Sequence, residues 1–402
     1  MIVPTRYEDI AALDATFHLP TYARKPVLFV RGQGMRLYDD AGREYLDFVA
    51  GIGAVNLGHA HPAVARAVCE QMSRLVQVSN LYHVEHRAAL AERLSELADG
   101  GWKAFLCNSG TEAIEGAIKL ARRWGKDRRG PECYEVVSAE RSFHGRTLGS
   151  LAATGQASKQ EAFEPLPAGF THIPLNDIEA LEAAVTERTG AVLLEPVQGE
   201  GGVYPCDEEY LAAARRLCDE REVLLVLDEV QTGFFRTGPA FAWQGYGVRP
   251  DVFTLAKSLA NGLPAGALLA SGTAAEAFTP GDHGSTFGGG PVICAAALAT
   301  IDALQEEGLG ENAERAGGQL STTLEELAQG TGRIREVRGR GLMLAAELVD
   351  PVAQNVATRC LERGVVLNAI GDHTLRLLPP LVCSIREIVI LRDTLRAVLG
   401  AN

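Results

Sequence analysis

An uninterrupted run of apolar residues that ends on a single acid constrains the fold of this chain most. Residues 223–227 read Val-Leu-Leu-Val-Leu and lead directly into Asp228. A strand that is apolar on both faces is typical of a parallel sheet covered by helices, and residues at its carboxyl end lie at the rim of that sheet. A second short run, 254–256, ends on Lys257. The sequence therefore predicts an acid and an amine at the carboxyl ends of neighbouring strands.

The alternation of strand and helix patterns continues on both sides of this run. Apolar stretches at 104–107, 134–137 and 191–194 are strand candidates. Residues 208–221 repeat apolar side chains on one helical face just before the strand at 223. We therefore predict an α/β fold with a mainly parallel central sheet and helices on both faces.

The two ends of the chain are predicted to form a second, smaller domain of the α+β type. A glycine-rich break at 288–290 precedes a long alanine-rich helix, and its position helps to divide the chain. The predicted division assigns residues 1–56 and 301–402 to the small domain and residues 57–300 to the large one. Within the small domain, strands are predicted at 27–30, 36–38, 45–48, 341–347, 365–367 and 375–378, with a closing helix at about 384–399.

The composition is that of an ordinary globular protein with an acidic balance. Of 402 residues, 47% are apolar, and the formal net charge of −13 disfavours nucleic acid and acidic membrane surfaces as partners. The Arg-rich run 333–340 is interpreted as a solvated strand and turn near the surface. The eight cysteines show no CxxC spacing, and we find neither a secretion signal nor an apolar stretch that could cross a membrane. We expect a cytoplasmic protein with reduced thiols.

An acid that faces an amine across a pocket is the pairing that a pyridoxal phosphate enzyme requires. This cofactor is an electron sink only while its ring nitrogen is protonated, and an Asp can hold that proton. A Lys binds the cofactor aldehyde as a Schiff base, and its pKa falls readily on desolvation. The ordinary alternative is that Asp228 ends a strand and Lys257 is solvated, which is the usual case for isolated residues. Other segments favour the cofactor.

Residues 108–112, Asn-Ser-Gly-Thr-Glu, join a strand candidate to a helical pattern. Such a turn exposes backbone N–H groups at a helix amino terminus, where they can bind a phosphate. Taken alone, Ser109-Gly110-Thr111 followed by Glu112 is also an ordinary helix cap. With Lys257 and Asp228 in the same chain, the phosphate interpretation is favoured.

Three further segments carry side chains suited to a planar, anionic cofactor and a carboxylate substrate. In the loop 141–147, Phe143 could stack on a ring and Arg146 could bind a carboxylate, although a surface loop is the alternative. Glu195 and Glu200 follow a strand candidate, which suggests the rim of a site. The glycine-rich segment 284–290 offers the hydroxyls of Ser285 and Thr286 but could be a linker.

An arginine and several histidines complete the set of candidate residues. Arg376 lies in an apolar strand candidate, so it requires an acidic partner and could receive a second carboxylate. His83 and His86 have the spacing of a metal pair, but no third ligand group accompanies them. We predict no metal site.

Together these motifs resemble the class III, or ornithine-type, pyridoxal phosphate aminotransferases, from about Thr21 to the carboxyl end. The resemblance implies fold type I, with Lys257 and Asp228 as catalytic residues, and a homodimer whose active sites are shared across the interface. It implies the cofactor ligands Ser109, Gly110, Thr111, Phe143, Glu195, Asp228, Glu229, Val230, Gln231, Lys257 and Thr286, the last serving the partner subunit. It implies the substrate-binding residues Tyr22, Arg146, Glu200, Ser285 and Arg376.

Within the family, the motifs are most similar to members that act on acetylornithine. The resemblance then implies transfer of the ω-amino group of N2-acetyl-L-ornithine to 2-oxoglutarate, a step of arginine biosynthesis. Arg146 would receive the donor's α-carboxylate and Arg376 that of 2-oxoglutarate, with Glu200 pairing with Arg376 in the donor half. Ile52 stands where ornithine-specific members have a tyrosine, which favours an acylated donor.

Several other functions remain open on the sequence. Within the same fold, the chain could be a succinylornithine, 4-aminobutyrate or carrier-linked lysine aminotransferase. A non-catalytic ligand- or partner-binding protein is a different class, disfavoured because a binding module has no use for a reactive lysine. A dinucleotide-dependent dehydrogenase is disfavoured because no GxGxxG opens a helix after a strand.

Overall fold

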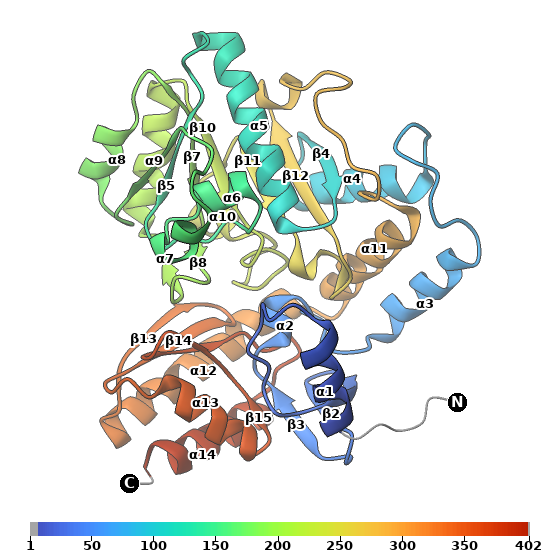
Figure 1. Cartoon of the computed structure of the whole chain (residues 1–402), viewed down its shortest axis with the longest axis vertical. Helices are drawn as coiled ribbons and strands as arrows, with labels where there is room; N and C mark the ends of the chain where they lie inside the picture. Colours follow the sequence, from blue (N-terminus) through green and yellow to red (C-terminus); the bar gives the residue numbers. More distant parts are fainter. Residues whose placement is uncertain (1–6, 401–402) are drawn as a thin grey trace.

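A seven-stranded sheet forms the centre of the large domain in the computed structural model, which describes residues 7–400 (Figure 1). Only β12 runs antiparallel to its neighbours, so the sheet is mainly parallel as predicted. The strand order is β4 (Trp102–Cys107), β12 (Gly266–Ser271), β11 (Val252–Leu255), β10 (Leu224–Asp228), β7 (Thr189–Leu194), β5 (Glu135–Ala139) and β6 (Phe170–Ile173).

The apolar run at 223–227 is buried on both faces of this sheet. Leu224 and Val226 belong to one apolar cluster, with residues of α5 (Gly110–Arg129), whereas Leu225 and Leu227 belong to the cluster of α9 (Glu208–Glu220). Alternation of side chains along a strand produces this division. It explains why the run contains no polar residue before Asp228.

Helices and short strands around the sheet complete the large domain. The helix α11 packs against α3 and α4. No helix within residues 7–400 combines the length and the hydropathy that crossing a membrane requires. The elements are α3 (Pro62–Met72), α4 (Glu85–Leu97), α6 (Leu148–Ala153), α7 (Ala157–Gln160), η1 (Glu161–Phe163), α8 (Ile178–Ala184), β8 (Val197–Gln198), β9 (Tyr204–Pro205), α10 (Ala242–Tyr246), η2 (Lys257–Ala260), η3 (Ala274–Glu276) and α11 (Pro291–Glu306).

The two ends of the chain meet in the lower part of Figure 1, where the blue and red segments lie together. Strand β3 pairs in parallel with β15, which places Leu46 beside Val365. The elements are α1 (Tyr7–Phe17), β1 (Phe29–Gln33), β2 (Arg36–Asp39), β3 (Glu44–Asp47), α2 (Ala50–Gly53), α12 (Leu309–Thr331), β13 (Ile334–Arg340), β14 (Met343–Leu348), α13 (Ala353–Glu362), β15 (Val365–Val366), β16 (Asn368–Ile370), β17 (Thr374–Leu377) and α14 (Ile385–Leu399).

Two details of this region differ from the sequence predictions. The strand expected to begin at Gly341 begins at Met343, because Gly341 has a φ of 54° and forms the turn between β13 and β14. The Arg-rich run is only partly solvated, since Arg338 is 9% exposed and pairs with Glu347 at 2.8 Å. The predicted closing helix is confirmed as α14, which Ser384 and Glu387 cap reciprocally.

Candidate active site

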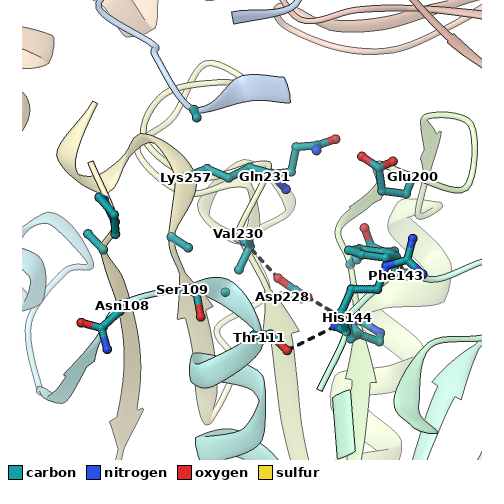
Figure 2. Close-up of a pocket in the computed structure, with 18 of the residues that line it drawn as sticks. Asn108, Ser109, Thr111, Phe143, His144, Glu200, Asp228, Val230, Gln231 and Lys257 are labelled. Carbon is teal, nitrogen blue, oxygen red and sulfur yellow. Dashed lines mark hydrogen bonds and ion pairs between the residues drawn. The ribbon is translucent and has the colours of Figure 1, made fainter. Parts of the chain in front are cut away.

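The predicted acid and amine lie at the carboxyl ends of adjacent strands. Strands β10 and β11 pair in parallel with Asp228 opposite Thr254, and a single residue separates the end of β11 from Lys257. Both side chains line a cavity of about 420 Å³. Figure 2 shows Lys257 and Phe143 on either side of Asp228 and Val230. This arrangement leaves room for a planar molecule between amine and acid.

The backbone and the charge of Lys257 are both perturbed. Its φ of 39° lies in the left-handed region, which a residue with a side chain adopts at a cost and which is often found at functional sites. Burial lowers the pKa of the Lys257 amine, although the negative charges of Glu200 and Asp228 oppose this effect. A lowered pKa raises the fraction of neutral amine that can act as a nucleophile or base.

A buried histidine holds Asp228 in place from behind. The carboxylate oxygen Oδ2 lies 2.8 Å from Nδ1 of His144, and Oδ1 accepts a hydrogen bond from the Val230 amide at 3.0 Å. The side chain of His144 is fully buried. Sequence reasoning did not assign a role to this residue, and its only signal was its position next to Phe143.

The turn at 108–112 caps the helix α5 and also lines the cavity, so both interpretations of its sequence apply. The Ser109 hydroxyl caps α5 by accepting the Glu112 amide at 3.3 Å, and the carboxylate of Glu112 returns to the Asn108 side chain. At the same time Ser109, Gly110 and Thr111 line the cavity, so the amino terminus of α5 faces it. A Cβ on Gly110 would lie 2.9 Å from Val230. The hydroxyl is thus committed to the cap, while the helix end is available to an anion.

Glu195 and Gln231 also line the cavity. The side chain of Glu195 is hydrogen-bonded, whereas that of Gln231 is not. The carboxylate of Glu195 accepts the amides of Phe143 and Gly199, each at 2.9 Å, and thereby holds the stacking loop. Burial raises the pKa of Glu195 to about 7. Both amide atoms of the buried Gln231 side chain lack a partner within the described residues. A buried amide of this kind requires a ligand that can donate or accept a hydrogen bond.

The predicted acidic partner of Arg376 is Glu200. Their side chains form an ion pair at 2.5 Å, and Arg376, which is 1% exposed, also donates to the Asn368 side chain. Burial acts to raise the pKa of Glu200, but the Arg376 charge outweighs it and the pKa is lowered. Glu200 lines the cavity and Arg376 lies directly behind it. The guanidinium is therefore neutralised until the pair opens.

Five predicted site residues do not line this cavity, and one of them is Arg376, the ion-pair partner of Glu200. Glu229 points into the core, where its carboxylate accepts the Trp243 amide at 2.8 Å, because side chains alternate after β10. Tyr22 is 77% exposed and lines a separate cavity with α1. Ser285 binds Asn108, and the carbonyl of Thr286 accepts from Gln77. Arg146 does line the cavity and is exposed at its mouth.

These side chains fit pyridoxal phosphate. They supply a buried amine, an acid fixed by a histidine, an unpartnered amide, an aromatic ring and the amino terminus of a helix. Each matches one part of the cofactor: its aldehyde, ring nitrogen, phenolic oxygen, ring face and phosphate. The fold and the cavity therefore define a pyridoxal phosphate enzyme of fold type I.

Comparisons with known proteins identify the family. The model of the class-III aminotransferases matches residues 20–399. The chain is 50% identical to a relative named acetylornithine aminotransferase from Gloeobacter violaceus, covering 92% of each chain. Its structure matches that of an ornithine aminotransferase from Toxoplasma gondii with a TM-score of 0.94 at 33% identity, covering 98% of this chain and 95% of that one. It also matches an N-acetylornithine aminotransferase from Stenotrophomonas maltophilia with a TM-score of 0.84 at 34% identity, covering 97% and 98%. The chain belongs to the class-III aminotransferases, which depend on pyridoxal phosphate.

Proposed function

We propose that this enzyme transfers the ω-amino group of N2-acetyl-L-ornithine to 2-oxoglutarate, giving N-acetylglutamate 5-semialdehyde and L-glutamate, in arginine biosynthesis. The observation that carries the proposal is the buried Lys257 amine facing Asp228 across the cavity. The name of the Gloeobacter relative, at 50% identity over nearly the whole chain, supports the choice of donor.

The charges around the cavity support a donor that carries its carboxylate far from the reacting amine. The Glu200–Arg376 pair neutralises the inner guanidinium, whereas Arg146 at the mouth forms no ion pair within residues 7–400. A donor whose α-carboxylate binds Arg146 can present its ω-amine to Lys257. 2-Oxoglutarate, with a carboxylate next to its reacting carbon, binds once Glu200 releases Arg376.

The residues of the site divide the chemistry between them. Pyridoxal phosphate, when bound, supplies an electron sink for the carbon that carries the amino group. Asp228, fixed by His144, would hold a proton on the ring nitrogen, and Phe143 and Gln231 would orient the ring. The Lys257 amine would act as general base and acid for the proton shift between the substrate carbon and the cofactor, which its lowered pKa favours.

Product formation from a panel of donors tests this proposal. With 2-oxoglutarate as acceptor, acetylornithine is expected to yield glutamate faster than ornithine, 4-aminobutyrate or lysine. Lys257→Ala should abolish turnover, and borohydride should no longer fix the cofactor to the peptide that contains residue 257. Preference for 4-aminobutyrate, or turnover by Lys257→Ala, would contradict the proposal.

We also propose a homodimer in which Thr286 serves the partner's cofactor site. Support comes from a group of exposed apolar side chains near Thr286: Leu81 is 87% exposed, Tyr82 66% and Phe287 67%. Asn80 ties these residues into one surface by donating to the carbonyls of Ser285 and Gly288. Exposed apolar patches of this kind favour a protein partner.

Sedimentation of a charge variant tests the dimer. Phe287→Asp should give monomers and weaken cofactor retention, because a charge would be buried in the interface. Val349→Asp replaces an apolar residue that is 46% exposed in the small domain and should remain dimeric. A monomeric wild type, or a dimeric Phe287→Asp variant with intact activity, would contradict this interface.

We place the enzyme in the cytoplasm. The eight cysteines are all free, and seven are buried. Burial raises the pKa of Cys107 to about 12, which suppresses the reactive thiolate. Free thiols of this number suit a reducing compartment.

A further inference from the structure

The short turn α2 has an unusual backbone. Its four consecutive residues, 50–53, have φ values between 51° and 76°, and two of them, Ala50 and Ile52, are not glycine. Residues with a side chain adopt this left-handed conformation singly, because each such residue costs free energy. A run of four therefore persists only where the surrounding structure holds it in place.

Side chains fix this turn at both of its ends. At its start, Oδ1 of the buried Asp47 accepts the amides of Val49 and Ala50 at 2.8 and 2.9 Å. At its end, the Ser258 hydroxyl donates to the Gly53 carbonyl at 2.6 Å. Asp47 belongs to the same amino-terminal segment as the turn, whereas Ser258 lies in η2 of the large domain. The second contact therefore ties the turn to the large domain.

Ser258 directly follows Lys257, whose backbone is also strained. Lys257 has a φ of 39° and lines the cavity, whereas Ser258 is 3% exposed and does not line it. On the other side of the bond, Ala54 lines the cavity, and a Cβ on Gly53 would lie 3.7 Å from the Gln231 side chain. In Figure 2 this part of the chain is the pale blue segment above Lys257 and Gln231. The hydrogen bond from Ser258 thus joins two strained segments that border the same cavity.

We propose that Ser258 is a positioning residue for Lys257 and acts through its hydrogen bond to the Gly53 carbonyl. The bond keeps the left-handed turn closed over the cavity and holds the backbone of Lys257 in the conformation that presents its amine to the cofactor. Because a preorganised site loses less binding free energy to ordering, the cofactor is retained more tightly. This role does not depend on which amino donor the enzyme uses.

Release of pyridoxal phosphate from the holoenzyme tests this role. Ser258→Ala removes the hydroxyl and should raise the rate of release about tenfold, the size expected for the loss of one buried hydrogen bond. Ser258→Cys keeps a side chain of similar shape but donates only weakly, so it should behave like the alanine variant. Ser258→Thr keeps the hydroxyl and should release the cofactor nearly as slowly as the wild type.

Hydrogen exchange of the holoenzyme reports on the turn itself. The amides of Gly53 and Ala54 donate to the carbonyls of Val49 and Ala50, so they are protected while the turn is closed. In the peptide that covers residues 48–56, exchange should be faster in Ser258→Ala and Ser258→Cys than in the wild type. Ser258→Thr should exchange as slowly as the wild type.

Ser138→Ala is the matched control for a loss of stability. Ser138 is also buried, and its hydroxyl donates to a backbone carbonyl, that of Ala153, at 2.7 Å. Because the same type of bond is lost, the melting temperature should fall about as much as in Ser258→Ala. The rate of cofactor release and the exchange of residues 48–56 should stay at their wild-type values.

Three results would overturn the role of Ser258. The first is release of the cofactor at the wild-type rate by both Ser258→Ala and Ser258→Cys. The second is equally fast release by Ser138→Ala, which would show that general stability controls retention. The third is fast release by Ser258→Thr although its turn exchanges as slowly as that of the wild type, since the closed turn would then not hold Lys257.

Discussion

At the scale of single residues, the site depends on side chains that never touch the substrate. His144 and Glu195 form part of the cavity wall, where they fix Asp228 and the Phe143 loop through hydrogen bonds of 2.8 and 2.9 Å. An acid that must hold a proton on one ring atom has to keep one orientation, and a buried hydrogen bond supplies this restraint.

Replacing His144 tests this restraint. His144→Leu should lower kcat/KM about 10- to 100-fold, the value of a hydrogen bond to a charged group, and should weaken cofactor retention. His144→Asn can place an amide nitrogen where Nδ1 stands and should retain most of the activity. Steady-state kinetics with acetylornithine and equilibrium dialysis of the cofactor measure both effects. Equal losses in the two variants would show that packing, and not the bond to Asp228, is what matters.

At the scale of secondary structure, close packing decides at which positions a side chain larger than that of glycine is tolerated. Helix α12 contains the adjacent glycines Gly317 and Gly318. A Cβ on Gly317 would lie 2.2 Å from the carbonyl oxygen of Gly341, in the turn between β13 and β14, whereas a Cβ on Gly318 would meet no atom within 4 Å. The turn at Gly341 therefore leaves no space for a side chain on Gly317 but does not restrict one on Gly318.

These adjacent glycines predict opposite effects of the same substitution. Gly318→Ala should stabilise the protein by about 0.5–1 kcal/mol, because alanine is the better helix former. Gly317→Ala should destabilise it by about 1–3 kcal/mol through overpacking. Melting temperatures of the two variants, measured under the same conditions, check the prediction. A higher melting temperature for both variants would contradict it and would mean that the turn at Gly341 shifts to make room for the methyl group on α12.

Strand β14 carries the second prediction at this scale. Glu347 accepts hydrogen bonds from Arg335, Arg338 and Thr374 at 2.7–2.8 Å. Burial acts to raise the pKa of Glu347, but these hydrogen bonds outweigh it and lower the pKa from 4.5 to about 2. Because the folded pKa is the lower one, the stability is present above about pH 4.5 and is lost as the pH falls towards 2.

Because solvent screens the partly exposed Arg335, this contribution is reduced to about 1–2 kcal/mol at neutral pH. Glu347→Gln should lower the melting temperature at pH 7, and its difference from the wild type should shrink as the pH is lowered through this window. Glu362→Gln, on the exposed face of α13, is the matched control and should show neither effect. A difference that is independent of pH would exclude titration of Glu347 as its source.

At the scale of the whole molecule, a buried arginine joins the cofactor domain to both chain ends. Arg236 is fully buried in the loop after β10. Its guanidinium donates to the carbonyls of Leu342 and Pro379 and to the side chain of Asn56. Burial lowers the pKa of Arg236 to about 9. Since Pro379 lies three residues after Arg376, the same contact holds the strand that carries Arg376 against the loop that follows Asp228.

Arg236→Met should therefore affect stability and substrate binding together. Leaving buried acceptors unpaired costs about 1–3 kcal/mol for each group, so the melting temperature should fall well below that of the wild type. KM for 2-oxoglutarate should rise more than KM for the amino donor, because Arg376 loses its support. Arg216→Met, which changes an exposed arginine on α9, should alter neither quantity.

The sequence carried enough information for the central sheet, for the cofactor and for the positions of Asp228 and Lys257 at the ends of adjacent strands. These features depend on short segments: a short apolar run between helical patterns is typical of a strand buried on both faces, and the residue at its carboxyl end then lies at the rim of the sheet, as Asp228 does. The family motifs then supplied the remaining predicted ligands. The position of Glu229 in the core was not predicted, because the sequence does not show whether side chains continue to alternate between the two faces of the sheet beyond the end of β10.

Contacts between distant segments emerged only when the chain was folded. They include the pairing of Leu46 with Val365, the hydrogen bonds of Arg236 and the approach of Lys159 to the Phe143 ring, and all of them depend on how whole elements pack. No local pattern encodes them, because each partner has an ordinary sequence environment of its own. The amino acid sequence by itself thus determined which reactive groups the site contains, whereas packing determined the neighbours of each charge, because a buried charge is stable only beside a partner.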